Sequence, residues 1–402
     1  MFNALDGVTI VEYAGFISGP YCGKLLAEMG ATVWKVEEPV TGDPARGYGP
    51  FPGGVPHREK SGLYLYLNTN KQSVSLDPSL PSGRDMFLHL AEKASLMIED
   101  RQPGEMTNMG LGYERLKSSN PGLVQVSITP YGQDGPKSSW KAHHLNTFHA
   151  SGEGYTLPGG ETHARFPDRS PVAGGAHLGD YDAGLMAASA AVAALFAREA
   201  SGTGQTVDIS KQEAIMGLSR LGIAQAMGQN IKYDRSRRYE YGGIFGCKDG
   251  YVILYPREDS QWKALVEIME RPELADDPRF QTRPARIQNG DEINQVISQW
   301  TASLGKEEIY YRVAPSGCPT AYFSTPQDTH QSPQLAAREF FEEISHPLAG
   351  TLRYPGRPYR FNSGGTNTKP APTLGQHNRE ILCGELGLTP DDLTRLSRGG
   401  VI

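Results

Sequence analysis

The segment GDYDAG (179–184) holds an acidic residue between glycines and leads directly into the alanine-rich stretch LMAASAAVAALFARE. Aspartate side chains are ordinarily ionised at neutral pH, and the positive end of a helix dipole favours that state. The carboxylate of Asp180 is therefore a candidate nucleophile that needs no separate base. The alternative is structural, because aspartate is also a preferred N-cap residue at the start of a helix.

The elements that position this segment alternate between strand and helix patterns. Strands are predicted at 8–13, 31–37, 73–78, 95–100, 123–129 and 206–210. Helices are predicted at 20–30, 83–94, 112–119 and 181–199, and after the last strand to about 228. Repeated strand–helix–strand units build a mainly parallel sheet covered on both faces. We therefore expect an α/β protein whose large domain is Rossmann-like.

The length of the chain, 402 residues, predicts more than one domain. We expect a large domain over residues 1–224, in which the segment 131–178 forms functional loops. The pattern then changes to a strand pair and to helices at 259–270 and 291–304, which predicts a smaller α+β domain over 225–330. The turn-rich segment 331–402 is expected to return to the large domain.

Composition argues against several classes of function. The net charge of −6 disfavours a general attraction to nucleic acid. The apolar runs are too short to predict a membrane span, and the N-terminal residues lack the pattern of a secretory signal. The four cysteines are far apart, which argues against a zinc site or a disulfide framework. We expect a cytoplasmic protein that holds no metal.

A nucleotide site is predicted between the first strand and the first helix, where Gly15, Gly19 and Gly23 accompany Pro20. Backbone N–H groups at such a helix start can bind phosphate or carboxylate. Glu37 follows about twenty residues later, as does the ribose-binding acid of dinucleotide-binding proteins, so an NAD-dependent dehydrogenase is an alternative. The spacing G-x-x-x-G-x-x-x-G nevertheless lacks the glycine that admits the pyrophosphate in G-x-G-x-x-G.

Taken together, several specific motifs resemble the family III CoA-transferases, whose fold relatives include α-methylacyl-CoA racemase. The matching segments follow one order along nearly the whole chain. They include LDGVTIVEYAGFISGP, LLAEMGATVWKVEEP with GDPAR, LNTNKQSVSLD, GDYDAG with its helix, GTGQTVDIS and HPLAGTLRYPGRP. The resemblance implies an enzyme that passes coenzyme A from an acyl-CoA donor to a carboxylic acid acceptor. It also implies an interlocked, ring-like homodimer.

The resemblance assigns roles to particular residues. Asp180 matches the aspartate that acts as the covalent nucleophile in the family. Gly242 and Gly243 resemble the mobile glycine loop that covers the active site in some members. CoA contacts are implied at four segments, which are Ile17 and Ser18, Asn68 to Lys71 (with Asn70 and Lys71), Asp100 to Gln102 (with Arg101), and Lys141 to His143 (with Ala142). For Lys141 the alternative is ordinary surface charge.

Three positions depart from the family pattern. Glu38 stands where members often carry arginine, Asn108 also replaces an arginine, and the letters EDR at 99–101 replace E-N-F or E-N-Y. Positive charge for the CoA phosphates is therefore reduced at these positions. Arg101 and Lys71 are the cations available to take their place.

The chemistry implied by the resemblance needs no catalytic triad, metal or phosphate-binding loop. We expect Asp180 to attack the acyl-CoA carbonyl, which yields an aspartyl anhydride and CoA thiolate. The thiolate then attacks the aspartyl carbonyl and leaves an aspartyl-CoA thioester and a free acid, and a second acid reverses the sequence. Backbone N–H groups near Ile17, Ser18, Gly242 and Gly243 are expected to stabilise the oxyanions.

His143 distinguishes two possible functions. By position it matches the catalytic histidine of the racemases, where several transferases carry tyrosine. A histidine and Asp180 on opposite faces of an α-carbon are the two bases that a 2-methylacyl-CoA racemase or acyl-CoA isomerase requires. The alternative is a polar loop residue, because His144 and His149 crowd the same stretch. The glycine pair and the GDYDAGL form of the motif favour transfer.

Overall fold

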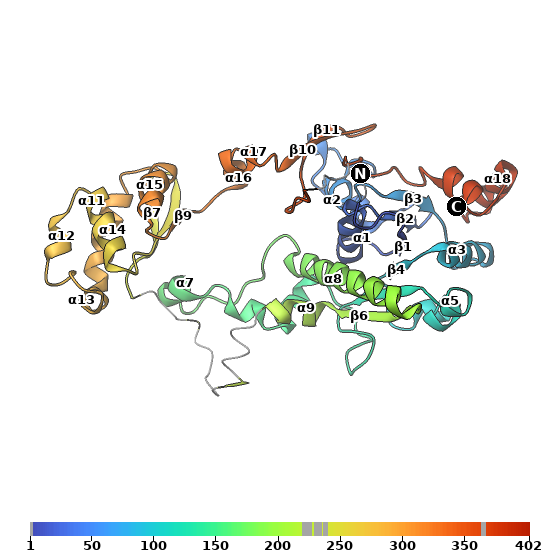
Figure 1. Ribbon diagram of the computed structural model, residues 1–402, viewed down its shortest axis with the longest axis horizontal. Helices are drawn as coiled ribbons and strands as arrows, with labels where there is room; N and C mark the ends of the chain where they lie inside the picture. Colours follow the sequence, from blue (N-terminus) through green and yellow to red (C-terminus); the bar gives the residue numbers. More distant parts are fainter. Residues whose placement is uncertain (1–2, 219–226, 229–234, 236–239, 363–366) are drawn as a thin grey trace. The chain divides into compact units, whose positions relative to one another are not determined.

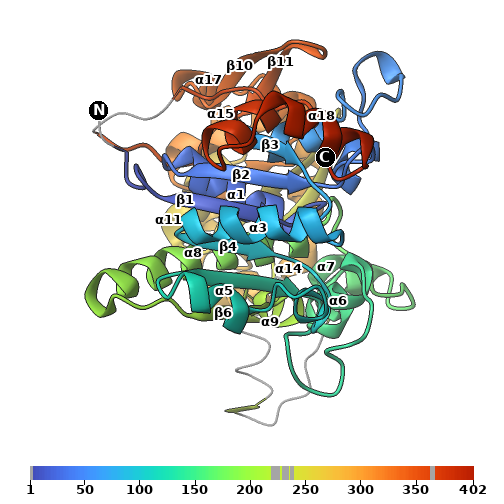
Figure 2. The ribbon, with the colours of Figure 1, turned by 90° about the vertical axis from the view of Figure 1, so that its right-hand side faces the viewer.

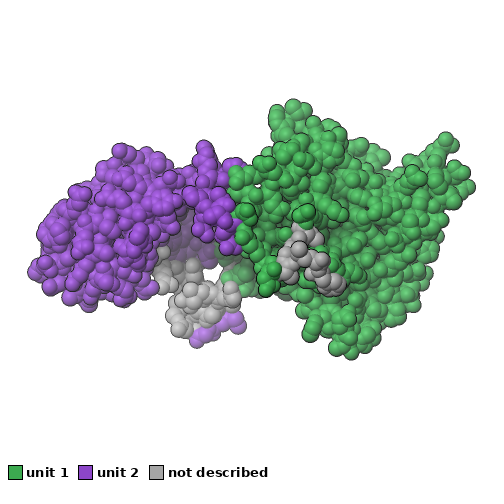
Figure 3. All heavy atoms as spheres, turned by 45° about the horizontal axis from the view of Figure 1, so that its top comes forward, with its two compact units in different colours: residues 1–154, 173–224, 339–402 green, residues 155–172, 225–338 purple. Residues whose placement is uncertain are grey.

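The computed structural model describes residues 3–218, 227–228, 235, 240–362 and 367–402. The chain divides into two compact units, which Figure 3 shows in different colours. Unit 1 comprises Met1–Gly154, Ala173–Ala224 and Glu339–Ile402, and unit 2 comprises Tyr155–Val172 and Gln225–Arg338.

The unit boundaries differ from the predicted domain boundaries at two places. Tyr155–Val172 groups with unit 2 rather than with the large domain, because its Gly160 N–H donates to the Arg235 carbonyl of that unit at 2.9 Å. Residues 331–338 also group with unit 2, and the remainder of the C-terminal segment groups with unit 1. The part of the predicted helix over 219–226 lies outside the described residues.

Unit 1 is built on a parallel sheet of six strands in the order β3-β2-β1-β4-β5-β6 (Figure 1). The strands are β1 (Thr9–Tyr13), β2 (Thr32–Glu37), β3 (Gln72–Ser75), β4 (Leu96–Glu99), β5 (Val124–Thr129) and β6 (Thr206–Ser210). The predicted α/β class with a parallel sheet is confirmed. The order reverses at β1, and ligands of open parallel sheets bind beyond the carboxyl ends of the strands at such a point.

Helices cover both faces of this sheet (Figure 2). Successive side chains of a strand point to opposite faces, so Ile10 and Val11 of β1 enter different cores. Ile10 packs in the core that includes Leu26 and Ala187, and Val11 in the core that includes Phe87. The first core is covered by α1 (Ser18–Glu28) and α8 (Leu178–Ser201), and the second by α3 (Pro81–Lys93) and α5 (Tyr113–Ser119).

The remaining elements of unit 1 are short or lie at the edges of the sheet. The segment 131–178, predicted as loops, contains two α-helices and a 3-10 turn, one of the helices in unit 2. The hairpin β10–β11 is antiparallel. The helical elements are η1 (Pro44–Gly47), η2 (Pro52–Gly54), α2 (Gly62–Leu67), α4 (Glu105–Asn108), α6 (His144–Ala150), α9 (Lys211–Leu218), η5 (Arg379–Cys383) and α18 (Pro390–Arg398), and the strands are β10 (Phe341–His346) and β11 (Gly350–Pro355).

Unit 2 contains a small antiparallel sheet in the order β7-β8-β9 and its own hydrophobic core around Trp262. The strand pair and the two helices predicted here are present as β7, β8, α11 and α14. Its strands are β7 (Gly243–Cys247), β8 (Gly250–Leu254) and β9 (Thr320–Tyr322). Its helices are α7 (Gly160–Arg165), α11 (Asp259–Ile268), α12 (Glu273–Asp276), α13 (Arg283–Gln288), α14 (Gly290–Thr301), α15 (Lys306–Val313), η4 (Ala314–Ser316), α16 (Pro326–His330) and α17 (Pro333–Ala337), and η3 (Glu153–Thr156) lies at the unit boundary.

Helix α8 combines a length of 24 residues with a mean hydropathy of 1.3, values that suit a membrane span by length and composition alone. It is the one such helix among the described residues. Its alanines at 183, 187, 188 and 191 are nevertheless buried in the core of unit 1, so we interpret it as a core helix. The predicted cytoplasmic location stays a prediction.

Candidate active site

Segments that follow three strands meet at the carboxyl edge of the sheet. Residues 14–17 follow β1, Asp100 follows β4, and Lys211 follows β6. Because the strands are parallel, these segments leave the sheet at one edge. The Gly15 N–H donates to Asp100 Oδ2 at 2.9 Å and joins two of the segments. The first turn of α8 completes the group, because Asp180 pairs with Lys211.

Asp180 is the buried centre of this group, with 3% of the residue exposed. Lys211 Nζ donates to its Oδ1 at 2.9 Å, and the Ser18 hydroxyl donates to the same oxygen at 3.3 Å. Among the described residues, the neighbour of Oδ2 is His177 Nδ1 at 3.5 Å, which makes no hydrogen bond. The two oxygens therefore differ: Oδ1 has two donors, whereas Oδ2 keeps lone pairs that no described donor uses.

The capping interpretation of Asp180 is wrong. Helix α8 begins at Leu178 and its N-cap is His177, whose side chain makes no cap hydrogen bond. Asp180 lies within the first turn, where the helix dipole favours a carboxylate. Its hydrogen-bond donors are Lys211 on α9 and Ser18 on α1. Tertiary contacts therefore hold the carboxylate.

Backbone strain marks the residues just before α8. Ala176 and His177 have left-handed φ angles of 56° and 58°, which cost a non-glycine residue about 1 kcal/mol or more each. Phe16, in the loop after β1, is also left-handed, with a φ of 63°. The rings of Phe16 and His177 pack edge to face with 5.1 Å between centroids. The two strained segments therefore support each other beside Asp180.

The glycines on both sides of Asp180 permit close packing of helices. A Cβ at Gly184 would lie 2.6 Å from the Ser18 carbonyl oxygen of α1. A Cβ at Gly179 would lie 2.4 Å from the Ile215 side chain of α9. The motif therefore lets α8 approach both neighbours closely enough for Asp180 to reach them.

A buried ion network supports the loop after β1. Asp43 Oδ1 accepts the Phe16 N–H at 3.0 Å, and Asp43 Oδ2 pairs with Lys35 Nζ at 2.7 Å. Glu12 joins Lys35 to Lys71 through ion pairs of 2.9 and 2.7 Å. These ionic side chains are at most 1% exposed. The network therefore fixes the loop that carries Ile17 and Ser18.

Lys71 does not reach the surface to hold a CoA phosphate. Its ammonium donates to the Pro20 carbonyl and to Asn68 Oδ1, in addition to its ion pair. Burial lowers the pKa of Lys71 to about 8, against the attraction of the neighbouring glutamate. Asn70 is left-handed, with a φ of 66°, and exchanges hydrogen bonds with the Lys369 backbone. These residues support α1 and anchor the C-terminal segment.

A cavity of about 400 Å³ opens beside the loop, at the carboxyl ends of β1 and β2. Arg101 lines it, lies over the Tyr13 ring at 4.5 Å and is 3.4 Å from Asp100. Burial raises the pKa of Asp100, and Arg101 opposes that shift. Glu38 also lines the cavity and accepts the Tyr13 hydroxyl at 3.0 Å. Arg101 is the one cation among its described lining residues.

The other residues predicted to contact CoA are not among the described residues that line this cavity. Ile17 is buried as the N-cap of α1. The Gln102 N–H donates to the Glu105 carboxylate at 3.1 Å. Lys141 is exposed, and Ala142 is half-buried. The structure thus brings Ser18 to Asp180 and brings Asp100 and Arg101 to the adjoining loop and cavity.

His143 is the exposed N-cap of α6 and contacts neither Asp180 nor His177 among the described interactions. Its neighbour His144 faces the site instead. The ring of His144 lies 5.6 Å from that of His177, and its Nε2 is 3.2 Å from the Gly174 carbonyl. The structure therefore places His144, and not His143, on the His177 side of Asp180.

Gly242 and Gly243 lie in unit 2 at the start of β7. Both are buried, with φ angles of 77° and 120°. The Gly242 N–H donates to Asn294 Oδ1 at 2.8 Å, and Gly243 pairs with Leu254 of β8. The Gly242 N–H is therefore used by Asn294 in this structure, and the oxyanion role suggested for Gly242 and Gly243 stays a prediction.

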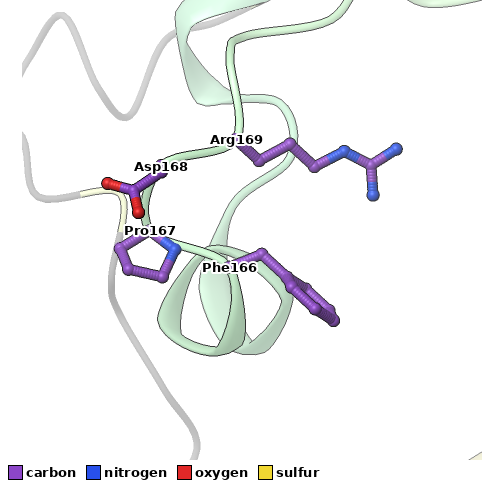
Figure 4. A pocket seen from close by; sticks show the side chains of 4 residues that line it. All are labelled: Phe166, Pro167, Asp168 and Arg169. Atoms are coloured by element: carbon purple, nitrogen blue, oxygen red, sulfur yellow. The ribbon is translucent and has the colours of Figure 1, made fainter.

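Unit 2 has a further pocket of about 440 Å³ (Figure 4). It is lined by Phe166, Pro167, Asp168 and Arg169. Phe166 and Arg169 extend to one side of their loop, and Asp168 points to the other. The described lining residues of this pocket are consecutive in one exposed loop, and none of them belongs to the buried group at Asp180.

Lys211 and His177 are site residues that sequence reasoning missed. A signal for Lys211 was present, because it directly follows the predicted strand TVDIS and so leaves the sheet at its carboxyl edge. His177 carried no comparable signal. Its contact with Asp180 depends on the left-handed turn before α8.

The parallel sheet and the buried Asp180 at its carboxyl edge are typical of α/β proteins that bind ligands at this edge. Comparison with known families specifies the class further. The model of CoA-transferase family III matches residues 5–378. The chain belongs to this family, and the protein is a CoA-transferase.

Two relatives and a solved structure match nearly the whole chain. A succinyl-CoA–D-citramalate CoA-transferase from Chloroflexus aurantiacus is 33% identical, over 99% of this chain and 98% of the relative. A formyl-CoA:oxalate CoA-transferase from Streptomyces avermitilis is 32% identical, over 100% of both chains. The crystal structure of a CAIB/BAIF family protein from Brucella suis matches with a TM-score of 0.84 and 26% identity, over 96% of this chain and 100% of that one.

Proposed function

We propose that the protein transfers CoA from an acyl-CoA to a carboxylic acid through covalent intermediates on Asp180. One observation carries the proposal. The Asp180 carboxylate is buried, yet the lone pairs of its Oδ2 are used by no described donor. Most buried polar atoms have a hydrogen-bond partner, so an oxygen of a buried carboxylate that has no described donor calls for an explanation, and attack on an acyl carbon supplies one.

The reaction proceeds by two exchanges at carbonyl carbons. Asp180 Oδ2 attacks the thioester carbonyl, which breaks the C–S bond and yields a mixed anhydride and CoA thiolate. The thiolate attacks the aspartyl carbonyl, which releases the first acid as its carboxylate and leaves an aspartyl-CoA thioester. A second carboxylate enters and reverses both steps. Charge is conserved throughout, and covalent catalysis divides one difficult exchange into easier ones.

The cavity beside the first loop supports a place for part of CoA. It lies at the carboxyl ends of β1 and β2, in a sheet whose order agrees with a Rossmann-like fold. Arg101 supplies positive charge there, whereas the buried Lys71 does not. We propose that Arg101 contacts a CoA phosphate, and that Glu38 weakens such contacts relative to an arginine at the same position.

We propose that the acids exchanged are small dicarboxylic acids or carboxylic acids of similar size. The named acceptors of the relatives include D-citramalate, oxalate, L-malate and glutarate, each of which carries two carboxyl groups. Their named donors are succinyl-CoA and formyl-CoA. A panel of these two thioesters with the four acids tests the substrate class directly.

The test of the covalent role compares two variants in this panel. Asp180→Ala should lose acyl exchange while CoA binding, measured by calorimetry, stays close to that of the wild type. His143→Phe should retain exchange, because His143 is exposed and has no described contact with Asp180. The reverse result, together with deuterium uptake at the α-carbon of a 2-methylacyl-CoA in D₂O, would favour the racemase alternative.

A homodimer is a separate proposal, which the exposed side of α8 supports. Leu185, Met186, Val192 and Phe196 are exposed on this helix, and Phe196 is 80% exposed. Contiguous apolar surface of this kind marks interaction sites. We expect light scattering to show a dimer for the wild type and a shift toward monomer for Phe196→Asp. A monomeric wild type at micromolar concentration would contradict this.

A further inference from the structure

We propose that Lys211 is a catalytic residue, which stabilises the negative charge that forms on Asp180 Oδ1 when the aspartyl carbonyl is attacked. The inference rests on the proposed covalent role of Asp180 and adds a residue to it. Lys211 is the first residue of α9, directly after β6. Its Nζ donates to Asp180 Oδ1 at 2.9 Å.

The two oxygens of Asp180 occupy different surroundings, which separates their roles. Oδ1 accepts from Lys211 and Ser18, whereas the described neighbour of Oδ2 is His177 at 3.5 Å. The oxygen with fewer donors is the better nucleophile, because donors stabilise its lone pairs. Oδ2 therefore forms the bond to the acyl carbon, and Oδ1 becomes the carbonyl oxygen of the anhydride.

The second exchange then places negative charge on Oδ1. The CoA thiolate forms a C–S bond to the aspartyl carbonyl carbon, and the electron pair of the C=O bond moves to Oδ1. Collapse restores the C=O bond and expels the acid with the bridging oxygen. The same oxyanion forms when the second acid attacks the thioester, and neither step requires a proton. Lys211 faces this oxygen in both directions of the reaction.

The geometry satisfies the requirement for such stabilisation. Effective donors lie 2.7–3.1 Å from the developing oxyanion, and Lys211 Nζ is already at 2.9 Å, whereas the Ser18 hydroxyl is at 3.3 Å. The Lys211 side chain is only 20% exposed, so water screens its charge weakly. Lys211 is therefore the stronger of the two donors.

The experiment compares Lys211→Met with Lys117→Met in the exchange of succinyl-CoA with the four acids named above. Lys117 is an exposed lysine of α5 and lies 5.7 Å from the Tyr113 ring centroid, so it serves as the matched control. Lys211→Met should lower kcat by about 100- to 1000-fold. The KM for succinyl-CoA should change by less than about threefold, because Lys211 contacts Asp180 and not the bound thioester. Lys211→Arg should recover part of the lost rate.

A second readout separates catalysis from simple support of the fold. Without Lys211, the thiolate adds more slowly to the anhydride, which therefore lives longer and is exposed to water. The ratio of free CoA thiol released to new acyl-CoA formed should rise in Lys211→Met and stay at the wild-type value in Lys117→Met. A structural defect would lower both products together and leave the ratio unchanged.

Three results would overturn the inference. The first is a kcat of Lys211→Met within about threefold of the wild type. The second is a loss of rate with an unchanged product ratio. The third is an equal loss of rate in Lys211→Gln and Lys211→Arg. These outcomes are distinct from failure of the proposed function. If Asp180→Ala retains exchange, the covalent mechanism fails, whereas a trapped Asp180 adduct with a fully active Lys211→Met removes only the role of Lys211.

Discussion

Asp180 and Glu37 are buried carboxylates of unit 1 with the same exposed fraction, 3%, but they differ in their donors. Glu37, at the end of β2, accepts from the backbone of Asp43, from Arg46 through Nε and a terminal nitrogen, and from the hydroxyls of Tyr64 and Ser73. Asp180 accepts from Lys211 and Ser18, both at one oxygen. We infer from this difference that Glu37 supports the fold and that Asp180 is available for chemistry.

The charge environment follows the same division. Burial alone would raise the pKa of Glu37, but the hydrogen bonds and charge of Arg46 outweigh it and lower the pKa. Arg46 also pairs with Glu59 at 2.6 Å and stacks on the Tyr64 ring at 3.6 Å. Left-handed backbone does not separate the two carboxylates, because it occurs at Ala176 and His177 before Asp180 and also at Val40 after Glu37. The donors do separate them, and we propose on that basis that Glu37 serves stability and Asp180 serves reactivity.

The largest expected effect on stability is at the saturated carboxylate. Glu37→Gln should lower the free energy of unfolding by about 3–5 kcal/mol, because it removes one of the two charged partners of the buried Arg46 and leaves only Glu59. Asp180→Asn should lower it far less while it removes exchange. Chemical denaturation followed by circular dichroism measures both. Equal destabilisation by the two variants would contradict the comparison.

A smaller effect is expected at Glu99, a third buried carboxyl, at the end of β4. Its Oε2 accepts the Arg101 N–H at 2.7 Å, and burial raises its pKa to about 7 in spite of that bond. The folded state therefore binds more protons than the unfolded state between pH 4.5 and 7. The stability that protonated Glu99 contributes to the folded state is therefore lost as the pH rises through this window.

Glu99→Gln removes this titration and should make the protein more stable than the wild type above pH 7, by at most about 3 kcal/mol. The measurement is the free energy of unfolding at several pH values between 4 and 8. Glu114→Gln, at an exposed position of α5, is the matched control. An identical pH dependence in Glu99→Gln and the wild type would show that Glu99 titrates alike in both states.

The sheet was predictable from the sequence because strand and helix patterns alternate along the chain, although β3 (QSVS) and β6 (TVDIS) are not apolar runs. The short β-branched run TVDIS became β6, and VTIVEY became β1. The position of Asp180 was predictable for a related reason, since its motif opens the long helix α8. Local patterns of sequence therefore determined the elements and the principal acidic residue.

Contacts between distant segments were not predictable in the same way. Lys71 is buried in an ion pair with Glu12 of β1, and the N-x-N-K pattern around Lys71 does not predict this contact. The choice between His143 and His144 depends on where α6 begins, because one residue of shift changes which ring faces His177. The contact of Lys211 with Asp180 could be recognised only from the fold, which brings the carboxyl end of β6 and the first turn of α8 together.

The most direct test of the central claim is the mass of the peptide that contains Asp180, after acid quenching during turnover with succinyl-CoA and an acceptor acid. We predict CoA attached to this peptide through an acid-stable thioester that is absent in Asp180→Ala. Hydroxylamine should release the CoA as free thiol and leave a hydroxamate on Asp180. Full exchange activity with the adduct on another residue, or with Asp180→Ala as active as the wild type, would contradict the account.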